Sequence, residues 1–318
     1  MAAVLVTGGS VFVSAAIVRF FRHAGDQVTV LNRGSRPAEA GVEQLSVDRN
    51  DIEALKTVLA GRRFDLVVDA VCYTAAQAEG LLAALGGRSG RLVEISSASV
   101  YVDRHDTPAP ESAAVGGAEV WGAYGQDKAG AEAAYLAAAG GFDRLGILRP
   151  PYIFGPNNSA DRETWFWARQ QAGLPIVIPG DGRTIAQFVH EDDLALAVDV
   201  VGRKRVGPTV YNVADPEVWT LSRLSMELAA VCGRPDTQVL AGQAAGDLPV
   251  RSWFPFRDHP CAVDPARLMA ETAWRPEASL ATRFAETLRV RAPLPAPVAT
   301  AAEQTLWERL GVGTVAAG

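Results

Sequence analysis

The chain opens with Ala3-Val4-Leu5-Val6-Thr7-Gly8-Gly9-Ser10, a short apolar run that ends in a turn of small residues. A helix-like segment follows over residues 11–24, Gly25 ends it, and residues 27–31 have the composition of a second strand. A strand, a glycine turn, a helix and a strand in this order place a pyrophosphate over the helix N-terminus, where free backbone N–H groups and the helix dipole favour an anion. The opening therefore predicts a dinucleotide-binding unit, with a tight turn that binds no nucleotide as the alternative.

The end of the second strand bears on which dinucleotide would bind. It reads Asn32-Arg33-Gly34. Folds that prefer NAD usually carry an acid here for the ribose hydroxyls, whereas an arginine accommodates the 2′-phosphate of NADP. Arg33 therefore favours NADP, with NAD as the alternative, although a solvated loop arginine would look the same. A third expected strand, residues 42–47, ends at Asp48, which is placed to accept from an adenine amino group or to cap the helix that begins near Asp51.

Tyr124 and Lys128 form the most informative pair of polar residues in the chain. They are four residues apart in Tyr124-Gly125-Gln126-Asp127-Lys128, so they share one face of a helix. An ammonium near a phenol, with a hydroxyl donor close by, favours the phenolate and makes tyrosine a usable proton shuttle. The hydroxyl donors stand upstream, at the end of a strand that reads Ser96-Ser97-Ala98-Ser99.

Length and composition narrow the class of protein. The 318 residues, 48% hydrophobic and 21% charged, are enough to bury a large core. A net charge of −6 argues against nonspecific binding to nucleic acid. No apolar run is long enough to cross a bilayer, and the N-terminus lacks the basic region of a signal peptide. The three cysteines, Cys72, Cys232 and Cys261, are too few and scattered for a disulfide framework or a metal cluster. We expect a cytoplasmic protein with no metal.

Strand and helix patterns alternate from residue 3 to about residue 150, which predicts an α/β fold with a doubly wound parallel sheet. Residues 74–85 and 122–139 are alanine-rich expected helices, with Thr74 as the N-cap of the first. The character changes after Pro150, where turns alternate with an aromatic-rich helix and a short strand. An alanine- and proline-rich linker precedes a last expected helix over residues 301–310.

Taken together, the chain resembles the extended short-chain dehydrogenase/reductase family of the NAD-dependent epimerase/dehydratase type. The resemblance runs nearly from end to end and rests, beyond the glycine turn, on residues 64–70, 91–101, 124–128, 148–150, 154–156, 187–194, 210–213 and 274–276. It implies a Rossmann domain over residues 1–150, to which residues 184–213 return. It also implies a smaller C-terminal α/β substrate domain within residues 151–318, built from about 150–185, 214–260 and the last helices.

The glycine turn departs from the family's Gly-x-x-Gly-x-x-Gly pattern. Gly8 holds the first place, but Val11 stands at the second and Ser14 at the third. Together with Asn32-Arg33-Gly34, this turn is most similar to an atypical branch that includes the chloroplast stem-loop-binding proteins. An NADP-sensing protein, an RNA-associated protein and a non-redox isomerase on the same scaffold are therefore alternatives to a redox enzyme.

The resemblance also implies the roles of the site residues. Tyr124 would act as the acid or base at the substrate oxygen, Lys128 would contact the nicotinamide ribose, and Ser97, with Ser99, would orient the substrate oxygen. The expected cofactor contacts are Gly8, Gly9, Ser10, Phe12, Val13, Asn32, Arg33, Asp48, Ala70, Val71, Ser96, Pro150 and Tyr152.

Candidate substrate contacts come from two sources. The carboxyl ends of the strands place Cys72, Tyr73, Tyr101 and Trp121 near the cleft. Segments that cover the substrate in relatives supply Tyr152, Asn157, Arg183, His190 and Trp253, although His190 could belong to a helix cap and Arg183 could be solvated. Groups available to a pyrophosphate are Asn157, Asn158, Arg162, Arg183 and Arg251.

These assignments lead to a functional expectation. We expect an NAD(P)-dependent reductase or epimerase that acts on a small polar molecule of the nucleotide-linked sugar type. Dehydration is disfavoured, because residues 97–100 read Ser-Ala-Ser-Val and offer no acidic pair. By analogy with relatives, the helices over residues 74–85 and 122–139 would form a homodimer interface.

Overall fold

The computed structural model describes residues 1–87, 89–102, 107–203 and 208–312. Its largest element is a seven-stranded sheet in the order β10-β6-β5-β4-β1-β2-β3, in which every neighbouring pair is parallel. The strands are β1 (Ala3–Thr7), β2 (Gln27–Asn32), β3 (Glu43–Ser46), β4 (Leu66–Asp69), β5 (Arg91–Ile95), β6 (Arg144–Arg149) and β10 (Thr209–Asn212). The expected doubly wound α/β fold is confirmed. The strand order reverses between β1 and β4, the position at which such sheets open a ligand crevice.

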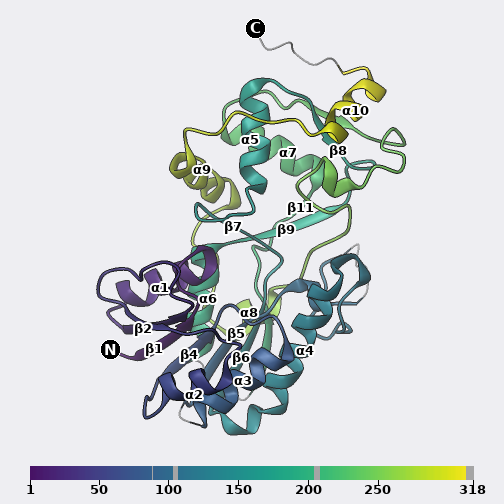
Figure 1. Cartoon of the computed structure of the whole chain (residues 1–318). Coiled ribbons are helices and arrows are strands. Elements are labelled where there is room, and N and C mark those ends of the chain that lie inside the picture. The colour runs from purple at the N-terminus through teal and green to yellow at the C-terminus, as the bar shows by residue number, and fades with distance from the viewer. Residues whose placement is uncertain (88, 103–106, 204–207, 313–318) are drawn as a thin grey trace.

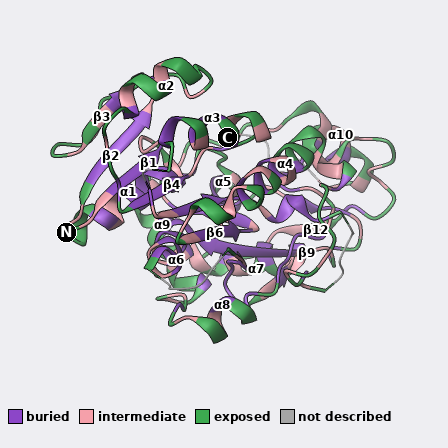
Figure 2. Ribbon diagram, turned by 90° about the horizontal axis from the view of Figure 1, so that it is seen from below, coloured by how far each residue is buried: buried purple, intermediate pink, exposed green. Residues whose placement is uncertain are grey.

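Helices cover both faces of this sheet (Figure 1). One face carries α1 (Phe12–His23), α6 (Glu191–Arg203) and α8 (Ala266–Glu271), and the other carries α2 (Ile52–Leu59), α3 (Ala75–Leu85) and α4 (Ala123–Ala137). Strands buried on both faces need apolar side chains on both sides, which explains runs such as Leu66-Val67-Val68. In Figure 2 the central strands are coloured as buried, whereas the helices turn exposed residues outward.

Local sequence signals set the helix boundaries. The Thr74 hydroxyl accepts from the Gln77 N–H at the start of α3, so the expected N-cap is confirmed. Asp51 caps α2 by accepting from the Ala54 N–H at 3.0 Å. Asp48 instead accepts from the Asn50 N–H at 2.9 Å within a turn. The alternative of a capping role for Asp48 was therefore wrong, because Asp51 occupies that position.

The smaller part of the molecule lies above the sheet in Figure 1. It contains a three-stranded sheet, β11-β9-β7, and a two-stranded sheet, β12-β8. The strands are β7 (Tyr152–Phe154), β8 (Ile176–Ile178), β9 (Ile185–His190), β11 (Val218–Thr220) and β12 (Gln238–Leu240), and the helices are α5 (Arg162–Ala172), α7 (Leu221–Val231), α9 (Leu280–Arg291) and α10 (Ala301–Leu310). Short 3-10 turns are η1 (Ala98–Val100), η2 (Glu119–Trp121), η3 (Ala139–Gly141) and η4 (Val250–Ser252). An aromatic core joins these elements, with Phe154 and Phe284 stacked at 4.0 Å between ring centroids.

Two details differ from the sequence-based expectation or refine it. Residues 185–190, which the expected return to the large sheet includes, form β9 in the three-stranded sheet, so the return begins with α6 and ends in β10. The last expected helix is confirmed as α10. A capping box between Thr300 and Glu303 begins it, and the buried Glu303 carboxylate pairs with Arg169 of α5 at 2.8 Å.

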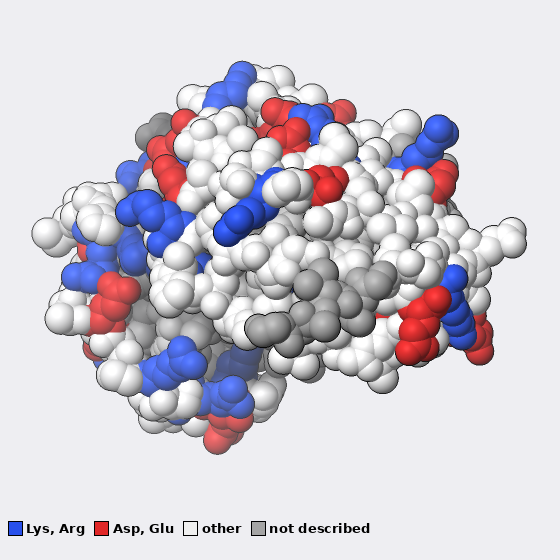
Figure 3. All heavy atoms as spheres, turned by 90° about the horizontal axis from the view of Figure 1, so that it is seen from above, with Lys and Arg blue, Asp and Glu red and all other residues white. Residues whose placement is uncertain are grey.

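Surface charge is mixed. On the face seen from above in Figure 3, basic and acidic side chains are interspersed and form no continuous basic band. Among the residues that the structure describes, none of the helices has the length and hydropathy of a membrane span.

Helices α3 and α4 pack side by side, as the expected dimer interface requires, and the dimer stays a prediction.

A buried ion pair holds α4 against the sheet. The Arg149 guanidinium at the end of β6 reaches Glu132 of α4, with 2.9 Å between Nε and Oε1. Both side chains are almost fully buried, and the Glu132 carboxylate also accepts from the Ser96 hydroxyl. Arg149 further donates to the Tyr101 hydroxyl, which donates to Asn212 of β10 at 2.6 Å. The network therefore links β5, β6, β10 and α4 at one edge of the sheet.

Removal of the Arg149 charge should destabilise the fold. We expect Arg149→Met to lower the free energy of unfolding by about 3–5 kcal/mol, because it leaves the Glu132 carboxylate buried without a cation. Lys56→Met, which breaks an exposed ion pair with Glu53, should cost less than about 0.5 kcal/mol. Urea unfolding followed by tryptophan fluorescence measures both. Equal losses in the two variants would contradict the role of the buried pair.

Candidate active site

The glycine turn opens onto a cleft of about 380 Å³ at the carboxyl ends of β1, β2 and β4. We call this the glycine-turn cleft; Gly8, Ser10, Arg33, Asn50 and Tyr73 are among the residues that line it. Gly8 and Gly9 have φ angles of +89° and +88°, which favour glycine. Helix α1 begins at this turn with no side-chain N-cap and no acid in its first turn. Its first backbone N–H groups are therefore available to an anion.

Asn32 and Arg33 have different tasks in this cleft. The Asn32 amide donates to the Gly8 carbonyl at 2.9 Å, and its oxygen accepts from the Gly34 N–H and from Gln44, each at 2.8 Å. Asn32 therefore shapes the turn. The Arg33 side chain is exposed and has no carboxylate partner within the described part of the chain. A free guanidinium at the end of β2 suits a phosphate.

Asp69, at the end of β4, fixes the floor of the glycine-turn cleft. Its buried carboxylate receives two hydrogen bonds from Arg49, at 2.8 and 2.9 Å, and one from the Thr7 hydroxyl. Burial alone would raise the pKa of Asp69, but the Arg49 charge and these hydrogen bonds lower it to about 2. Because Thr7 ends β1, the contact holds the two strands together where their order reverses.

A second cavity of about 390 Å³ lies next to the glycine-turn cleft. We call it the Tyr124 cavity; it is lined by Phe12, Ser96, Ser97, Ser99, Trp121, Tyr124, Pro150, Pro151, Tyr152, Ile153, Arg162, Arg251, Pro255, Phe256, Arg257 and Cys261. The Tyr124 ring lies 6.4 Å from the ring of Tyr73, which lines the glycine-turn cleft. The two spaces therefore adjoin at this pair of tyrosines.

The structure brings Tyr124, Ser97 and Ser99 into one cavity, as the sequence predicts. Helix α4 approaches the serine segment closely, because a Cβ atom added to Gly125 would stand 2.6 Å from the Ser99 carbonyl oxygen. The Ser97 hydroxyl accepts from the Ser99 N–H at 3.2 Å. The Ser99 hydroxyl is buried and has no hydrogen-bond partner among the described residues. A buried hydroxyl without a partner at the cavity wall is suited to a polar ligand atom.

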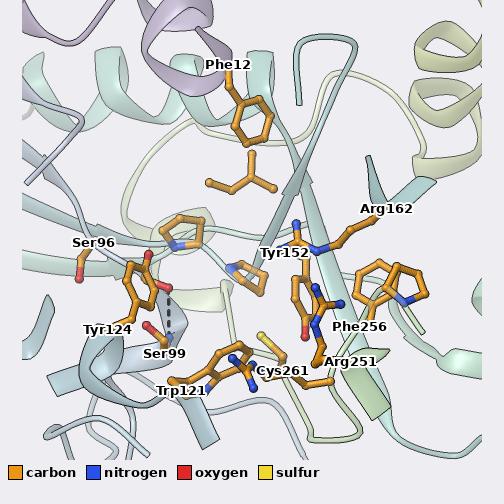
Figure 4. Close-up of a pocket in the computed structure, with 16 residues that line it drawn as sticks. Phe12, Ser96, Ser99, Trp121, Tyr124, Tyr152, Arg162, Arg251, Phe256 and Cys261 are labelled. Atoms are coloured by element: carbon orange, nitrogen blue, oxygen red, sulfur yellow. Dashed lines mark hydrogen bonds between the residues drawn. The ribbon is translucent and has the colours of Figure 1, made fainter. Parts of the chain in front are cut away.

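Three arginines line the same cavity. Figure 4 shows Arg162 and Arg251 at one end and Tyr124 with Ser99 at the other, with Phe12 above. The Arg162 guanidinium lies 5.2 Å from the Tyr152 ring centroid, and that of Arg257 lies 5.3 Å from Trp121. No carboxylate of the described residues forms an ion pair with any of the three. Burial and repulsion from Arg162 and Arg257 lower the pKa of Arg251. Such a cluster of unpaired cations is suited to an anion.

Lys128 lies behind the cavity, outside both linings. Its ammonium donates to the Cys72 carbonyl at 2.7 Å, to the Ile95 carbonyl at 2.6 Å and to Glu94 at 3.0 Å. All three N–H bonds of the ammonium therefore have protein acceptors. The expected contact with a nicotinamide ribose stays a prediction, and it requires one of these hydrogen bonds to be exchanged.

The expected cofactor contacts divide between the two spaces. Gly8, Ser10, Asn32, Arg33, Asp48 and Val71 line the glycine-turn cleft, whereas Phe12, Ser96, Pro150 and Tyr152 line the Tyr124 cavity. Gly9, Val13 and Ala70 line neither. Gly9 packs against Val30 of β2, where an added Cβ atom would lie 2.4 Å from a methyl group. Val13 belongs to the core under α1, and the Ala70 N–H donates to the Thr7 hydroxyl.

Among the expected substrate contacts, Trp121 lines the Tyr124 cavity and Tyr73 lines the glycine-turn cleft. Cys72 and Asn157 lie elsewhere. The Cys72 thiol is buried in the core on the α2–α4 side of the sheet, and burial raises its pKa. The Asn157 amide donates to Glu191 at 2.9 Å and thereby joins the loop after β7 to α6.

Arg183, His190 and Trp253 also lie outside the cavity. The Arg183 side chain is 87% exposed beside Asp181, which corresponds to the solvated alternative. His190 is buried against Phe154, and burial lowers its pKa, so it serves the core. Trp253 packs in the aromatic core of the smaller part next to Phe254. None of these three side chains lines the Tyr124 cavity or the glycine-turn cleft.

Arg257 and Phe256 line the cavity but were missed by the sequence analysis. They belong to Arg251-Ser252-Trp253-Phe254-Pro255-Phe256-Arg257, which sets two arginines around aromatic residues. That pattern is the signal in the sequence that could have identified Phe256 and Arg257. Within the described residues, no three His, Cys, Asp or Glu side chains are grouped to hold a metal ion.

Comparisons with known proteins agree with this geometry. The chain is 28% identical over 294 residues to the chloroplast stem-loop binding protein of 41 kDa b from Arabidopsis thaliana, covering 87% of this chain and 76% of that protein. It is 30% identical over 240 residues to 2′-dehydrokanamycin reductase from Streptomyces kanamyceticus, covering 73% of this chain and 67% of that protein.

The fold is also that of solved structures. The structure of UDP-glucose 4-epimerase from Thermotoga maritima with UDP-glucose superposes with a TM-score of 0.75 at 18% identity, covering 91% of this chain and 98% of that chain. Residues 4–214 match the family model described as the NAD dependent epimerase/dehydratase family. This chain therefore belongs to the NAD dependent epimerase/dehydratase family, the extended type of short-chain dehydrogenase/reductase.

Proposed function

We propose that the protein is an NADP-dependent reductase or epimerase that acts at a carbinol or carbonyl carbon of a small anionic molecule, with a nucleotide-linked sugar as the favoured class. One observation carries the proposal. The phenol of Tyr124 and the hydroxyls of Ser97 and Ser99 share one cavity with three unpaired arginines, and that cavity adjoins the glycine-turn cleft.

The glycine-turn cleft has the features that a nicotinamide dinucleotide needs. The first turn of α1 offers backbone N–H groups for the pyrophosphate, and Gly8 leaves room where a Cβ atom would meet Ser14 and Val71. Val11 is half exposed at the rim and leaves the turn open. Arg33, Ser10 and Ser35 line the end of the cleft near β2 and would hold a 2′-phosphate. When bound, the nicotinamide supplies the hydride donor or acceptor.

The residues of the Tyr124 cavity would transfer a proton to or from the substrate oxygen. Tyr124 holds or receives a proton at the substrate oxygen, while the Ser97 and Ser99 hydroxyls orient that oxygen by hydrogen bonds. The arginines at the far end would bind the anionic group and so place the reacting carbon near Tyr124. Phe12, Trp121 and Tyr152 add aromatic rings to the lining of this cavity.

The relatives support this class of substrate without fixing it. One is named a reductase of 2′-dehydrokanamycin, and one solved structure contains UDP-glucose. A role like that named for the stem-loop binding protein is less favoured, because the chain has a net charge of −6 and the viewed surface has no basic band.

Tyr124→Phe tests the proton-transfer role. We expect kcat/KM to fall by about 10²–10⁴ fold, because the variant keeps the ring and loses the transferable proton. Reduction and oxidation of a panel of keto and hydroxy compounds, followed by NADPH absorbance, measures the loss. Tyr211→Phe is the control and should retain activity, because Tyr211 of β10 lines neither the Tyr124 cavity nor the glycine-turn cleft. Full activity in Tyr124→Phe would disprove the mechanism.

Arg162→Met tests the anion site. Loss of a charge-assisted hydrogen bond costs about 1.5–3 kcal/mol, so the dissociation constant of an anionic ligand should rise about 10–150 fold. Calorimetric titration with UDP and with inorganic pyrophosphate measures it. Arg183→Met serves as the control, since Arg183 is exposed outside the cavity. The site would be rejected if both variants bound the probes like the native protein.

Arg33→Ala tests the choice of dinucleotide. The native protein should bind NADPH more tightly than NADH, and the variant should lose about tenfold in NADPH affinity with little change for NADH, because only NADPH carries the 2′-phosphate. Fluorescence titration with both cofactors gives the two constants. Arg36→Ala removes a neighbouring exposed arginine that does not line the cleft. Equal affinities of the native protein for NADPH and NADH would contradict the choice of NADP.

A further inference from the structure

Glu94 is an unexpected charge in the middle of the large sheet. It interrupts the apolar strand Arg91-Leu92-Val93-Glu94-Ile95, and its side chain is fully buried. Its Oε1 atom accepts from the Lys128 ammonium at 3.0 Å, and the Lys128 side chain is only 3% exposed. The other carboxylate oxygen has no hydrogen-bond partner among the described residues. A buried carboxylate that is only half satisfied is costly to the fold.

Stability does not explain this pair. Replacement of a buried ion pair by apolar side chains of similar volume is often neutral or stabilising. An apolar residue would also suit a strand that is covered on both faces. The position of the pair suggests a different reason, because Lys128 lies one helical turn after Tyr124 on α4, and Tyr124 lines the cavity.

Lys128 is the cation that faces Glu94. The other acids near the pair have their own cations, since Asp69 pairs with Arg49 and Glu132 pairs with Arg149. The remaining titratable groups around Glu94 and Lys128 are the Cys72 thiol, the Tyr124 phenol and the Tyr135 phenol, which donates to Asp69. Burial raises the pKa of Glu94 to about 7, in spite of the Lys128 charge. The Glu94 carboxylate and the Lys128 ammonium therefore set the local charge behind Tyr124.

We propose that Glu94 is a positioning residue for the reaction. It holds the Lys128 ammonium on the inner side of α4, together with the Cys72 and Ile95 carbonyls, and its negative charge offsets part of the positive charge that the Tyr124 phenol experiences. Glu94 touches neither cavity, so it acts through Lys128. The inference rests on the proposed function, in which Tyr124 transfers the proton.

The test measures the ionisation of the phenol without any substrate. Phenolate absorbance is titrated in the protein and in its Tyr124→Phe variant, and the difference belongs to Tyr124. We expect Glu94→Gln to move the midpoint of this difference titration down by about one pH unit, because the amide keeps the shape and removes the negative charge. Glu94→Asp, which keeps the charge, should restore the native midpoint.

The control is Glu303→Gln, which neutralises an equally buried carboxylate that pairs with Arg169 in the smaller part. It should leave the midpoint unchanged. A native midpoint in Glu94→Gln, or an equal shift in Glu303→Gln, would overturn the proposal. The pH dependence of kcat should move in the same direction as the titration. If the titration shifts but no substrate is turned over, the charge effect stands and the proposed function fails.

A second variant covers the case in which Glu94→Gln does not fold. In Glu94→Leu/Lys128→Met the buried pair becomes apolar, so the protein should unfold at a urea concentration close to that of the native chain. We expect its difference titration to move to higher pH, because the Lys128 ammonium, one helical turn from Tyr124, is gone. A native midpoint in this double variant would show that the pair does not act on Tyr124.

Discussion

Parallel strands present all their carboxyl ends at one edge of a sheet, and the site of this protein depends on that constraint. The turn after β1, the segment after β5 and the loop after β6 all lie at this edge, so Gly8, Ser97 and Pro150 line adjoining spaces although they are far apart in the sequence. The reversal of strand order between β1 and β4 leaves a crevice that no helix fills. The smaller part then covers the crevice and contributes the arginines from α5, from η4 and from the segment after η4.

Buried charges hold this edge in place. Asp69, Glu94 and Glu132 lie behind the two cavities, and each pairs with a single cation: Arg49, Lys128 and Arg149 respectively. Each pair joins a strand to a neighbouring segment or a helix, so the ends of β4, β5 and β6 cannot shift independently. Desolvation makes such pairs expensive. Their location next to the cavities indicates that the geometry of the site, more than the stability of the fold, accounts for them.

The sequence was sufficient for the fold because periodic apolar strands, glycine turns and helix caps are local signals. It was sufficient to place Tyr124, Ser97 and Ser99 at one cavity, because each lies close to an element boundary, the start of α4 or the end of β5. It was not sufficient for side chains whose roles depend on partners elsewhere in the chain. Asn157 donates to Glu191, and His190 packs against Phe154, and neither lines the Tyr124 cavity or the glycine-turn cleft. Arg257 was missed for the same reason, because only the tertiary fold brings it to Trp121.

The edge strand of the large sheet has a consequence for synthesis on the ribosome. Strand β6 pairs with β5 on one side and with β10 on the other, and the whole of β7, α5, β8, β9 and α6 lies between β6 and β10 in the sequence. Chains emerge from the N-terminus, so β6 leaves the ribosome long before its second neighbour. A nascent chain that stalls before residue 209 therefore carries a bare row of backbone donors and acceptors, a template for pairing with other chains. Once β10 has been synthesised, it pairs with β6 and satisfies these backbone groups.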